Sequence, residues 1–435
     1  MALEAVQPDP FRHGCIFPTN GMLVSTDVGD RRLSDARSIV DARRPIGGGM
    51  PLQGRYFCAV SASPKPHRIL IVGQTPPPHG GQAVMIAELL KLRSPRLRLF
   101  HVRMAFSEDM ESVGKFALRK VWVLFTTILR IAIARFRYRT PVLYYPPSGP
   151  NKVPVLRDIV LLCATRWLFR KVVFHFHAGG VSTFGPQLPA FLRPLYRYAY
   201  GRPALSIRTA PQNPPDGIAF GARRDVVVPN GIPDMRGQVP ERNAAPGDPL
   251  VILFTGVLIP SKGVRIVLEA FRLLLQGGVN ARLQLMGKWG DPAFERECAR
   301  WVEEHGLAGR VEFLGVRKDL DKFTHFAGCD IFCFPSYFEA ESFGLVLVEA
   351  MQFAKPLVST LWRGIPSVVQ EGVNGFLVPI QDAPAVAERL HRLAADPALR
   401  KRMGEEGRRI FLRDLTLEAF HRSMERELVA VSEAN

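Results

Sequence analysis

Short apolar runs alternate with longer segments of helical periodicity along most of the chain. The run RILIVGQT, from Arg68 onward, is bounded by Pro and Gly and predicts a buried parallel strand. A Gly-rich turn and the amphipathic segment AVMIAELLKL follow it, and the runs PVLYY and KVVFHFH continue the alternation. Strands that alternate with helices in this way predict a doubly wound α/β sheet.

The pattern restarts after VVVPNGIPD (residues 226–234) and a polar linker. Six more candidate strands follow: LVILFTG, ARLQLMG, RVEFLG, DIFCFPS, PLVST and GFLVP. We therefore predict an α/β fold class with two Rossmann-like doubly wound domains, at residues 67–235 and 236–415. Residues 1–66 are rich in Arg, Pro, Gly and Ser without lasting periodicity, and we expect a mostly disordered leader there.

The net charge of +17 favours anionic partners, which include nucleic acid, an anionic bilayer and phosphorylated substrates. The basic residues are not interleaved with aromatic residues in a recognisable nucleic-acid-binding module, so nucleic acid is not an expected partner. The six cysteines are scattered, and the N-terminus lacks the charged-then-apolar order of a secretory signal. These two features predict free thiols and a cytoplasmic protein.

Residues 114–139 contain an apolar stretch from Val121 to Ala134, interrupted by Arg130 and flanked by basic residues. The stretch is too short and too charged to span a bilayer. One interpretation is a basic amphipathic helix on an anionic membrane surface. The other is an ordinary helix of the first domain with a solvated basic rim.

The strongest chemical signal is SYFEAESFGLVLVEAM (residues 336–351), in which seven residues separate Glu341 from Glu349. A helix that starts near Gly344 would present free backbone N–H groups to a diphosphate. The two carboxylates would then accept hydrogen bonds from sugar and ribose hydroxyls on either side. Two solvated glutamates on an amphipathic helix are the simpler interpretation, but apolar flanks such as Leu347 and Val348 favour a lined cleft.

This segment resembles the Glu-x7-Glu signature of the retaining glycosyltransferases of family 4, also called glycosyltransferase group 1, and the resemblance extends over about residues 68–425. It implies the GT-B architecture, in which two Rossmann-like domains face each other across a cleft. It also implies metal-independent, retaining transfer of a hexose from a UDP- or GDP-linked sugar, with no other cofactor. Residues 416–435 resemble the last helix of the family, which returns to the first domain.

The resemblance also implies roles for single residues. Glu349 matches the glutamate that binds the ribose hydroxyls, and Glu341 matches the one beside the donor sugar. The element GVLIPSKG makes Lys262 the lysine that neutralises the diphosphate. The implied catalytic residues are Glu341, Lys262 and His177. The implied donor-binding residues are Gly80, Gly81, Gly256, Lys262, Ser342, Phe343, Gly344, Leu345 and Glu349.

One position departs from the pattern of the family, which places an Arg directly after the glycine of that element. This chain has Val257 there, so the diphosphate lacks one expected cation. Arg265, Lys288 and Arg317 are candidates to replace it. The departure favours an alternative function, a catalytically weak or dead scaffold of the same fold at a membrane.

In the first domain, PPPHGGQA joins a strand to a helix through Gly80 and Gly81, and residues without a Cβ let the backbone approach a ligand closely. His79 beside them is either a ligand contact or a loop histidine. The run KVVFHFHAGG places His175 and His177 on one face of a strand. Ligands of open α/β sheets bind beyond the carboxyl ends of strands, so His177 is the better candidate.

Asp319 and Asp321 resemble a metal-binding Asp-x-Asp motif, but they fall in a probable helix beside lysines, where solvated carboxylates are expected. No metal site is therefore predicted. The basic first domain and residues 114–139 favour a lipid-linked or polysaccharide acceptor at the inner face of the plasma membrane.

Overall fold

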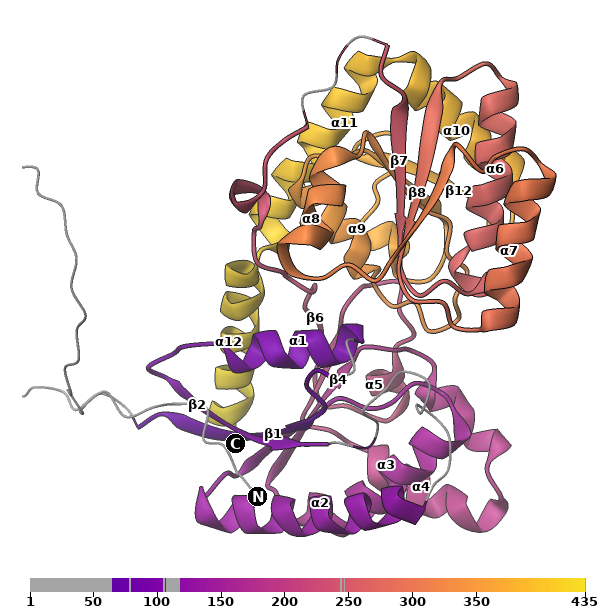
Figure 1. The fold of residues 1–435 in the computed structure, drawn as a ribbon. Coiled ribbons are helices and arrows are strands. Elements are labelled where there is room, and N and C mark those ends of the chain that lie inside the picture. Colours follow the sequence, from indigo (N-terminus) through magenta and orange to yellow (C-terminus); the bar gives the residue numbers. More distant parts are fainter. Residues whose placement is uncertain are drawn as a thin grey trace, which may run out of the picture. The chain divides into compact units, whose positions relative to one another are not determined.

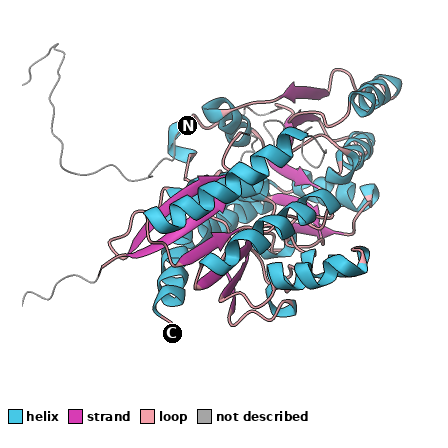
Figure 2. Cartoon of the chain, turned by 90° about the horizontal axis from the view of Figure 1, so that it is seen from below, coloured by secondary structure: helices cyan, strands magenta, loops and turns pink. Residues whose placement is uncertain are grey.

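The computed structural model describes residues 65–77, 80–104, 106, 118–242, 245 and 247–434. The predicted leader falls outside these residues except at its last two positions, and His79 also lies outside them. Within the described residues the chain forms two six-stranded parallel sheets with helices on their faces (Figure 1). Figure 2 shows the same strands in magenta behind the cyan helices that cover them.

The first sheet has the strand order β2-β1-β3-β4-β5-β6. Its strands are β1 (His67–Gly73), β2 (Leu97–Arg103), β3 (Val142–Tyr145), β4 (Lys171–Phe176), β5 (Leu205–Arg208) and β6 (Asp225–Val227). The three runs predicted in this region are β1, β3 and β4. The prediction missed β2, β5 and β6, which lie at or next to the edges of the sheet, where polar residues interrupt the apolar runs.

Helices cover both faces of this sheet. They are α1 (Gly81–Leu90), α2 (Leu118–Arg137), α3 (Lys152–Thr165), α4 (Arg193–Tyr200) and α5 (Asp216–Ala219). Ile69 and Ile71 of β1 belong to one buried apolar cluster, whereas Leu70 and Val72 belong to another. Successive side chains of a strand point to opposite faces, so both faces of the sheet are buried, as its continuous apolar runs predict.

The second sheet has the strand order β12-β11-β10-β7-β8-β9. Its strands are β7 (Leu250–Thr255), β8 (Ala281–Met286), β9 (Val311–Gly315), β10 (Ile331–Phe334), β11 (Leu357–Thr360) and β12 (Gly375–Val378). They coincide with the six runs predicted after the linker. The helices between and after them are α6 (Val264–Gln276), α7 (Pro292–Glu304), α8 (Asp319–Gly328), α9 (Leu345–Gln352), α10 (Ala383–Ala395) and α11 (Pro397–Ile410).

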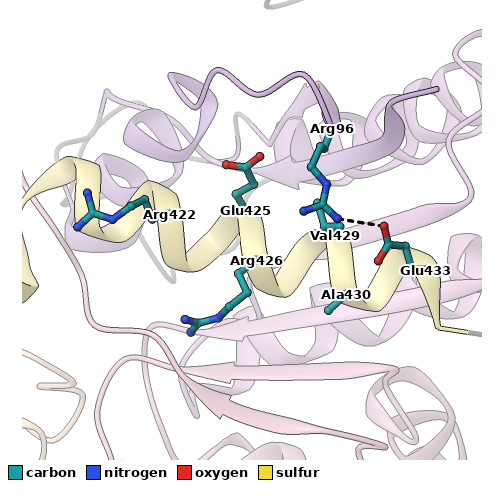
Figure 3. Close-up of a pocket in the computed structure, with 7 residues that line it drawn as sticks. All are labelled: Arg96, Arg422, Glu425, Arg426, Val429, Ala430 and Glu433. Carbon is teal, nitrogen blue, oxygen red and sulfur yellow. Dashed lines mark hydrogen bonds and ion pairs between the residues drawn. The ribbon is translucent and has the colours of Figure 1, made fainter. Parts of the chain in front are cut away.

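The last helix, α12 (Leu417–Glu433), packs on the first sheet rather than the second. Its buried residues Phe420, Met424 and Leu428 share a cluster with the apolar residues of β1. Arg96 also reaches the helix and donates a 3.1 Å hydrogen bond to Glu433 (Figure 3). Full burial stabilises each apolar side chain by roughly 1.5–3 kcal/mol, so these three residues hold the end of the chain on the N-terminal half.

Candidate functional site

Two loops of the second sheet meet at the carboxyl ends of adjacent strands. Strand β10 pairs with β7, and the loop after each strand carries part of the predicted site. The backbone N–H of Tyr337, after β10, donates to the carbonyl of Ser261, after β7, over 2.8 Å. Ligands of open parallel sheets bind at this edge. The sheet order therefore brings together two segments that are distant in sequence.

Helix α9 begins at Leu345, next to the start predicted from the sequence. Its N-cap residue is Gly344, whose φ of 76° lies in the left-handed region. A Cβ on Gly344 would also lie 2.8 Å from Leu347, so both the backbone conformation and the available space favour glycine. The first backbone N–H groups of this helix have no partner within the helix, and they carry its positive dipole end. The helix start predicted from the sequence is therefore present, and its role as an anion site stays a prediction.

Glu341 and Lys262 form an ion pair directly before this helix. The Nζ of Lys262 lies 2.5 Å from Oε2 of Glu341, and the two side chains are only 16% and 10% exposed. Phe338 packs against the ammonium group, with its ring centroid 4.4 Å from Nζ. Lys262 is held in place because Gly263 follows it with a φ of 88° and lies against the carbonyl of Pro335. Lys262 and Glu341, to which the family resemblance assigns neighbouring roles, are therefore in direct contact.

Glu349 lies farther along α9 and uses one of its two carboxylate oxygens. Its Oε1 accepts a 2.5 Å ion-pair contact from Lys322 of α8. Its Oε2 is buried and has no hydrogen-bond partner among the described residues. A buried acceptor without a partner costs about 1–3 kcal/mol, a cost that a ligand hydroxyl would remove. The sequence analysis did not identify Lys322, because no local pattern links α8 to α9.

Ser342 and Phe343 lie between the ion pair and the helix. Phe343 is buried and anchors the loop in the core of the second half. The carbonyl of Ser342 accepts hydrogen bonds from Asn213 Nδ2 at 2.9 Å and from Thr209 Oγ1 at 3.2 Å. Asn213 and Thr209 follow β5 of the first sheet and are themselves buried. The N-terminal half therefore fixes the backbone of the loop at α9, and the sequence analysis missed both residues.

The predicted glycines occupy two different environments. A Cβ at Gly81 would lie 3.5 Å from Leu345, so the start of α1 is in contact with the start of α9. A Cβ at Gly80 would meet nothing within 4 Å, and its φ of −95° suits any residue. Gly256 ends the turn after β7, and its carbonyl would lie only 1.7 Å from a Cβ at Gly287. The role of each in donor binding stays a prediction.

His175 and His177 lie side by side at the carboxyl end of β4, with ring centroids 4.0 Å apart and the ring planes tilted by 35°. Both are buried, and neither Nε2 has a hydrogen-bond partner among the described residues. Nδ1 of His175 lies 2.6 Å from the hydroxyl of Tyr144 on β3, which fixes the orientation of its ring. Beyond the strand, Asp216 accepts from the N–H groups of Gly180 and Ser182, each at 2.8 Å. Burial favours the neutral form of His177, whose Nε2 is available to a ligand.

Acid should destabilise the protein through these two histidines. Burial lowers the pKa of His177 to about 3 and, together with the neighbouring His177, holds the pKa of His175 well below its usual value. In the unfolded chain, histidine has a pKa of about 6.5. Between about pH 3 and 6.5 the unfolded chain therefore binds more protons than the folded chain, and stability is lost as the pH falls through this window.

We expect His177→Asn to reduce this slope by up to about 1.4 kcal/mol per pH unit. The measurement is the free energy of unfolding in urea at several pH values within the window. The exposed His391 provides the matched control, because His391→Asn should leave the slope as it is in the wild type. Equal slopes for the wild type and His177→Asn would contradict the burial argument.

The structure also locates the residues considered as replacements for the missing cation at Val257. Arg265 pairs with Glu297 at 3.1 Å, and Arg317 contacts Asp321 at 3.4 Å. These contacts direct both guanidinium groups toward α7 and α8. Lys288 follows Gly287 after β8, and its carbonyl accepts from the N–H of Leu258 over 2.8 Å. Whether any of them compensates for Val257 stays a prediction.

Arg363 is a further cation near this site that the sequence analysis did not single out. It follows β11 with a φ of 48°, an unusual conformation for a residue with a side chain. The next residue, Gly364, lies so close to the carbonyl of Ser342 that a Cβ there would be 1.8 Å from it. The Nε of Arg363 is buried and has no hydrogen-bond partner among the described residues. Its only sequence signal is a charged residue before a glycine at the end of a strand.

Asp319 and Asp321 lie in the first turn of α8, as the sequence predicts for ordinary helical carboxylates. In the part of the chain that the structure describes, no group of three or more His, Cys, Asp or Glu side chains is arranged to hold a metal ion.

The family model for glycosyl transferases group 1 matches residues 235–410, which contain Lys262, Glu341 and Glu349. This part of the chain is a glycosyl transferases group 1 domain. The group 1 domain includes the whole second sheet and α6 to α11.

Curated relatives match over part of the chain. The putative colanic acid biosynthesis glycosyltransferase WcaL of Escherichia coli K12 is 33% identical over 174 residues, which are 39% of this chain and 42% of WcaL. The O-antigen chain mannosyltransferase C of Escherichia coli is 33% identical over 160 residues, 37% of this chain and 41% of that protein. The matches thus span about two fifths of the length of these relatives.

Solved structures match over most of the chain. Sucrose-phosphate synthase of Thermosynechococcus elongatus has a TM-score of 0.60 at 21% identity and covers 84% of this chain and 99% of its own. The HepE protein of Anabaena, solved with UDP, has a TM-score of 0.63 at 19% identity. The match covers 83% of this chain and 100% of the HepE chain. Together with the two parallel six-stranded sheets, these matches confirm the predicted GT-B fold around the group 1 domain.

Proposed function

We propose that the chain is a retaining glycosyltransferase that moves a hexose from a UDP- or GDP-linked sugar to a polysaccharide or lipid-linked acceptor. The observation that carries the proposal is the partly buried Lys262–Glu341 pair at the N-terminus of α9, followed by Glu349, whose Oε2 has no partner among the described residues. A nucleotide sugar offers hydroxyls, a diphosphate and ribose hydroxyls in the same order. The similarity to a colanic acid biosynthesis glycosyltransferase and an O-antigen chain mannosyltransferase supports a saccharide acceptor.

The chemistry requires stabilisation of the charge that develops on the departing diphosphate. In this proposal, Lys262 and the first N–H groups of α9 provide it. Glu341 and the neutral His177 orient the sugar through its hydroxyls, and Glu349 holds the ribose. The leaving phosphate takes the proton of the acceptor hydroxyl, so the proposal needs neither a metal ion nor a protein nucleophile.

A panel of UDP-, GDP- and ADP-sugars, assayed by release of the nucleoside diphosphate, tests this proposal. We expect release from one donor class by the wild type and its loss in Glu341→Ala. Glu339 is the matched control, because its carboxylate lies two residues away on the same loop and its side chain is 80% exposed. Glu339→Ala should keep the wild-type rate.

The second candidate function is a scaffold of the same fold without turnover, and Val257 is the observation that favours it. Donor binding without nucleotide release, in the wild type as in Glu341→Ala, would establish the scaffold. Val257→Arg adds the cation at the position where the family resemblance implies one. A large gain of turnover in this variant would identify Val257 as the cause of low activity.

We further propose that α2 places the protein on an anionic membrane surface, at the inner face of the plasma membrane. Every charged residue of α2 is basic. Trp122, Phe125 and Phe136 are 68%, 61% and 67% exposed, and with Leu129 and Ile133 they follow helical spacing along one side. None of the described helices is long and apolar enough to cross a bilayer. Apolar burial and charge attraction together suit a helix that lies in the lipid interface.

Replacing Trp122 and Phe125 by serine should weaken binding to anionic vesicles by about 10²- to 10⁴-fold, because burial of each of these two large apolar side chains contributes roughly 1.5–3 kcal/mol. Sedimentation with phosphatidylglycerol-containing vesicles measures this. Arg130→Gln with Arg137→Gln should reduce binding to anionic vesicles and leave any binding to neutral vesicles unchanged. Wild-type sedimentation of both variants would exclude α2 as the contact.

A further inference from the structure

Two surface cavities of the described residues differ in the charge of their walls. One, of about 420 Å³, lies along α12 and mixes arginines with Glu425 and Glu433 (Figure 3). The other, of about 500 Å³, lies at the end of α4 and has no acidic residue in its lining. Arg166, Arg197 and Arg202 line it together with Tyr198 and Phe220. We call this second space the arginine cavity.

Arg166 forms a fixed wall of the arginine cavity. Its guanidinium donates 2.8 Å hydrogen bonds to the carbonyls of Ala199 and Gly201 at the end of α4, and it lies 5.4 Å from the ring centroid of Tyr198. Burial lowers the pKa of this guanidinium, because the charged form loses part of its hydration. A bound anion would restore favourable charge interactions to a group that is already oriented by the backbone.

Arg197 and Arg202 are exposed, and neither side chain has a hydrogen bond or an ion pair with any residue that the structure describes. Arg202 has a φ of 49°, in the left-handed region, where non-glycine residues are uncommon. Its N–H donates to the carbonyl of Phe220 over 2.7 Å, which holds the chain in this conformation. The fold therefore keeps three like charges around one cavity, an arrangement that an anion stabilises.

The arginine cavity borders exposed apolar residues. Trp167, directly after Arg166, is 68% exposed, Leu195 of α4 is 46% exposed, and Ile218 of α5 is 58% exposed. Helix α3 packs against both α2 and α4, so the cavity belongs to the same group of helices as the exposed side of α2 (Figure 1). An anion with an attached apolar portion matches both features better than a free anion does.

We propose that the arginine cavity binds the phosphate of an anionic lipid headgroup, preferentially a phosphomonoester or diphosphate, while Trp167 and Leu195 contact the lipid interface. A free phosphate and a lipid headgroup share this dianionic group, and we assign the membrane lipid as its source. This inference rests on the proposed membrane contact of α2 and is independent of the transfer chemistry at α9. Each arginine fork binds a pair of phosphate oxygens, and a terminal phosphate offers a third oxygen and a higher negative charge than a phosphodiester, which suits a site with several arginines.

The test compares full-length protein on phosphatidylcholine vesicles that contain either phosphatidic acid or phosphatidylglycerol at equal surface charge. The wild type should prefer phosphatidic acid. Arg197→Gln with Arg202→Gln should remove this preference. We expect binding to phosphatidic acid vesicles to weaken by about 10- to 100-fold, because the variant loses the hydrogen bonds of two guanidinium groups to the charged phosphate. Arg170→Gln with Arg223→Gln removes the same charge from exposed positions outside the cavity and should keep the preference.

An unchanged preference in the cavity variant, with an unchanged unfolding midpoint, would overturn the proposal. Calorimetry with inorganic phosphate distinguishes the source, because binding as tight as that of phosphatidic acid vesicles would identify a free phosphate ligand and overturn the lipid assignment. Salt-sensitive DNA binding that only the cavity variant loses would also overturn it.

Nucleotide release should be normal in the cavity variant, so a failed transferase assay in the wild type is a separate result. The α2 serine variant should lose binding to all anionic vesicles, whereas the cavity variant should lose only the preference for phosphatidic acid. This difference separates the general membrane contact from the selection of the headgroup.

Discussion

Replacing Lys262 by alanine is expected to lower kcat for sugar transfer by about 10²- to 10³-fold, the usual effect of removing one group that stabilises developing charge. Lys262 is the cation whose ammonium contacts Glu341 at the start of α9. Val257 stands where the resemblance to the family implies an arginine. The substitution also leaves the carboxylate of Glu341 buried without its partner. Steady-state release of the nucleoside diphosphate, with the preferred donor, measures the effect.

Three further variants show whether the lysine acts on the donor or only on Glu341. Lys262→Arg keeps the charge and should retain more activity than Lys262→Ala. Lys262→Ala and Glu341→Ala should be non-additive when combined, because they act as one unit. Lys318→Ala removes an exposed lysine of the same half and should have no effect. Wild-type kcat in Lys262→Ala, with a normal unfolding midpoint, would contradict the catalytic role of Lys262.

Replacing Glu349 by alanine is expected to raise KM for the donor by about 10- to 100-fold, with a much smaller change in kcat. The reason is that Oε2 of Glu349 is a buried acceptor without a partner, and hydrogen bonds to charged groups contribute about 1.5–3 kcal/mol each. The ribose is remote from the reacting carbon, so its contacts should act equally on the ground state and the transition state.

Lys322→Ala separates this effect from disruption of the ion pair. It removes the partner of Oε1 and leaves Oε2 in place, so its effect on KM should be smaller than that of Glu349→Ala. Glu349→Gln should fall between the two, because it keeps one acceptor but loses the charge. A fall in kcat in Glu349→Ala without a change in KM would assign Glu349 to the transition state and contradict the ribose role.

The amino-acid sequence by itself determined the central strands of both sheets and the start of α9. Strands such as β4 and β7 are continuous apolar runs because both faces of a parallel sheet are buried. Gly344 marked the start of α9 because the left-handed backbone before a helix is a local requirement that glycine meets. The strands β2, β5 and β6 were missed because polar residues interrupt their apolar runs, which weakens the periodic signal.

The tertiary structure alone decided which side chains are partners at the candidate site. Lys262 and Glu341 are 79 positions apart, and they meet because β7 and β10 are neighbours in a sheet whose order does not follow the chain. Asn213 and Thr209 reach Ser342 from the first sheet, and Lys322 reaches Glu349 from α8. Periodicity, caps and turns act over a few residues, whereas these contacts depend on strand order and on the packing of separate elements. For this reason the residues with local signals were predictable, and their partners were not.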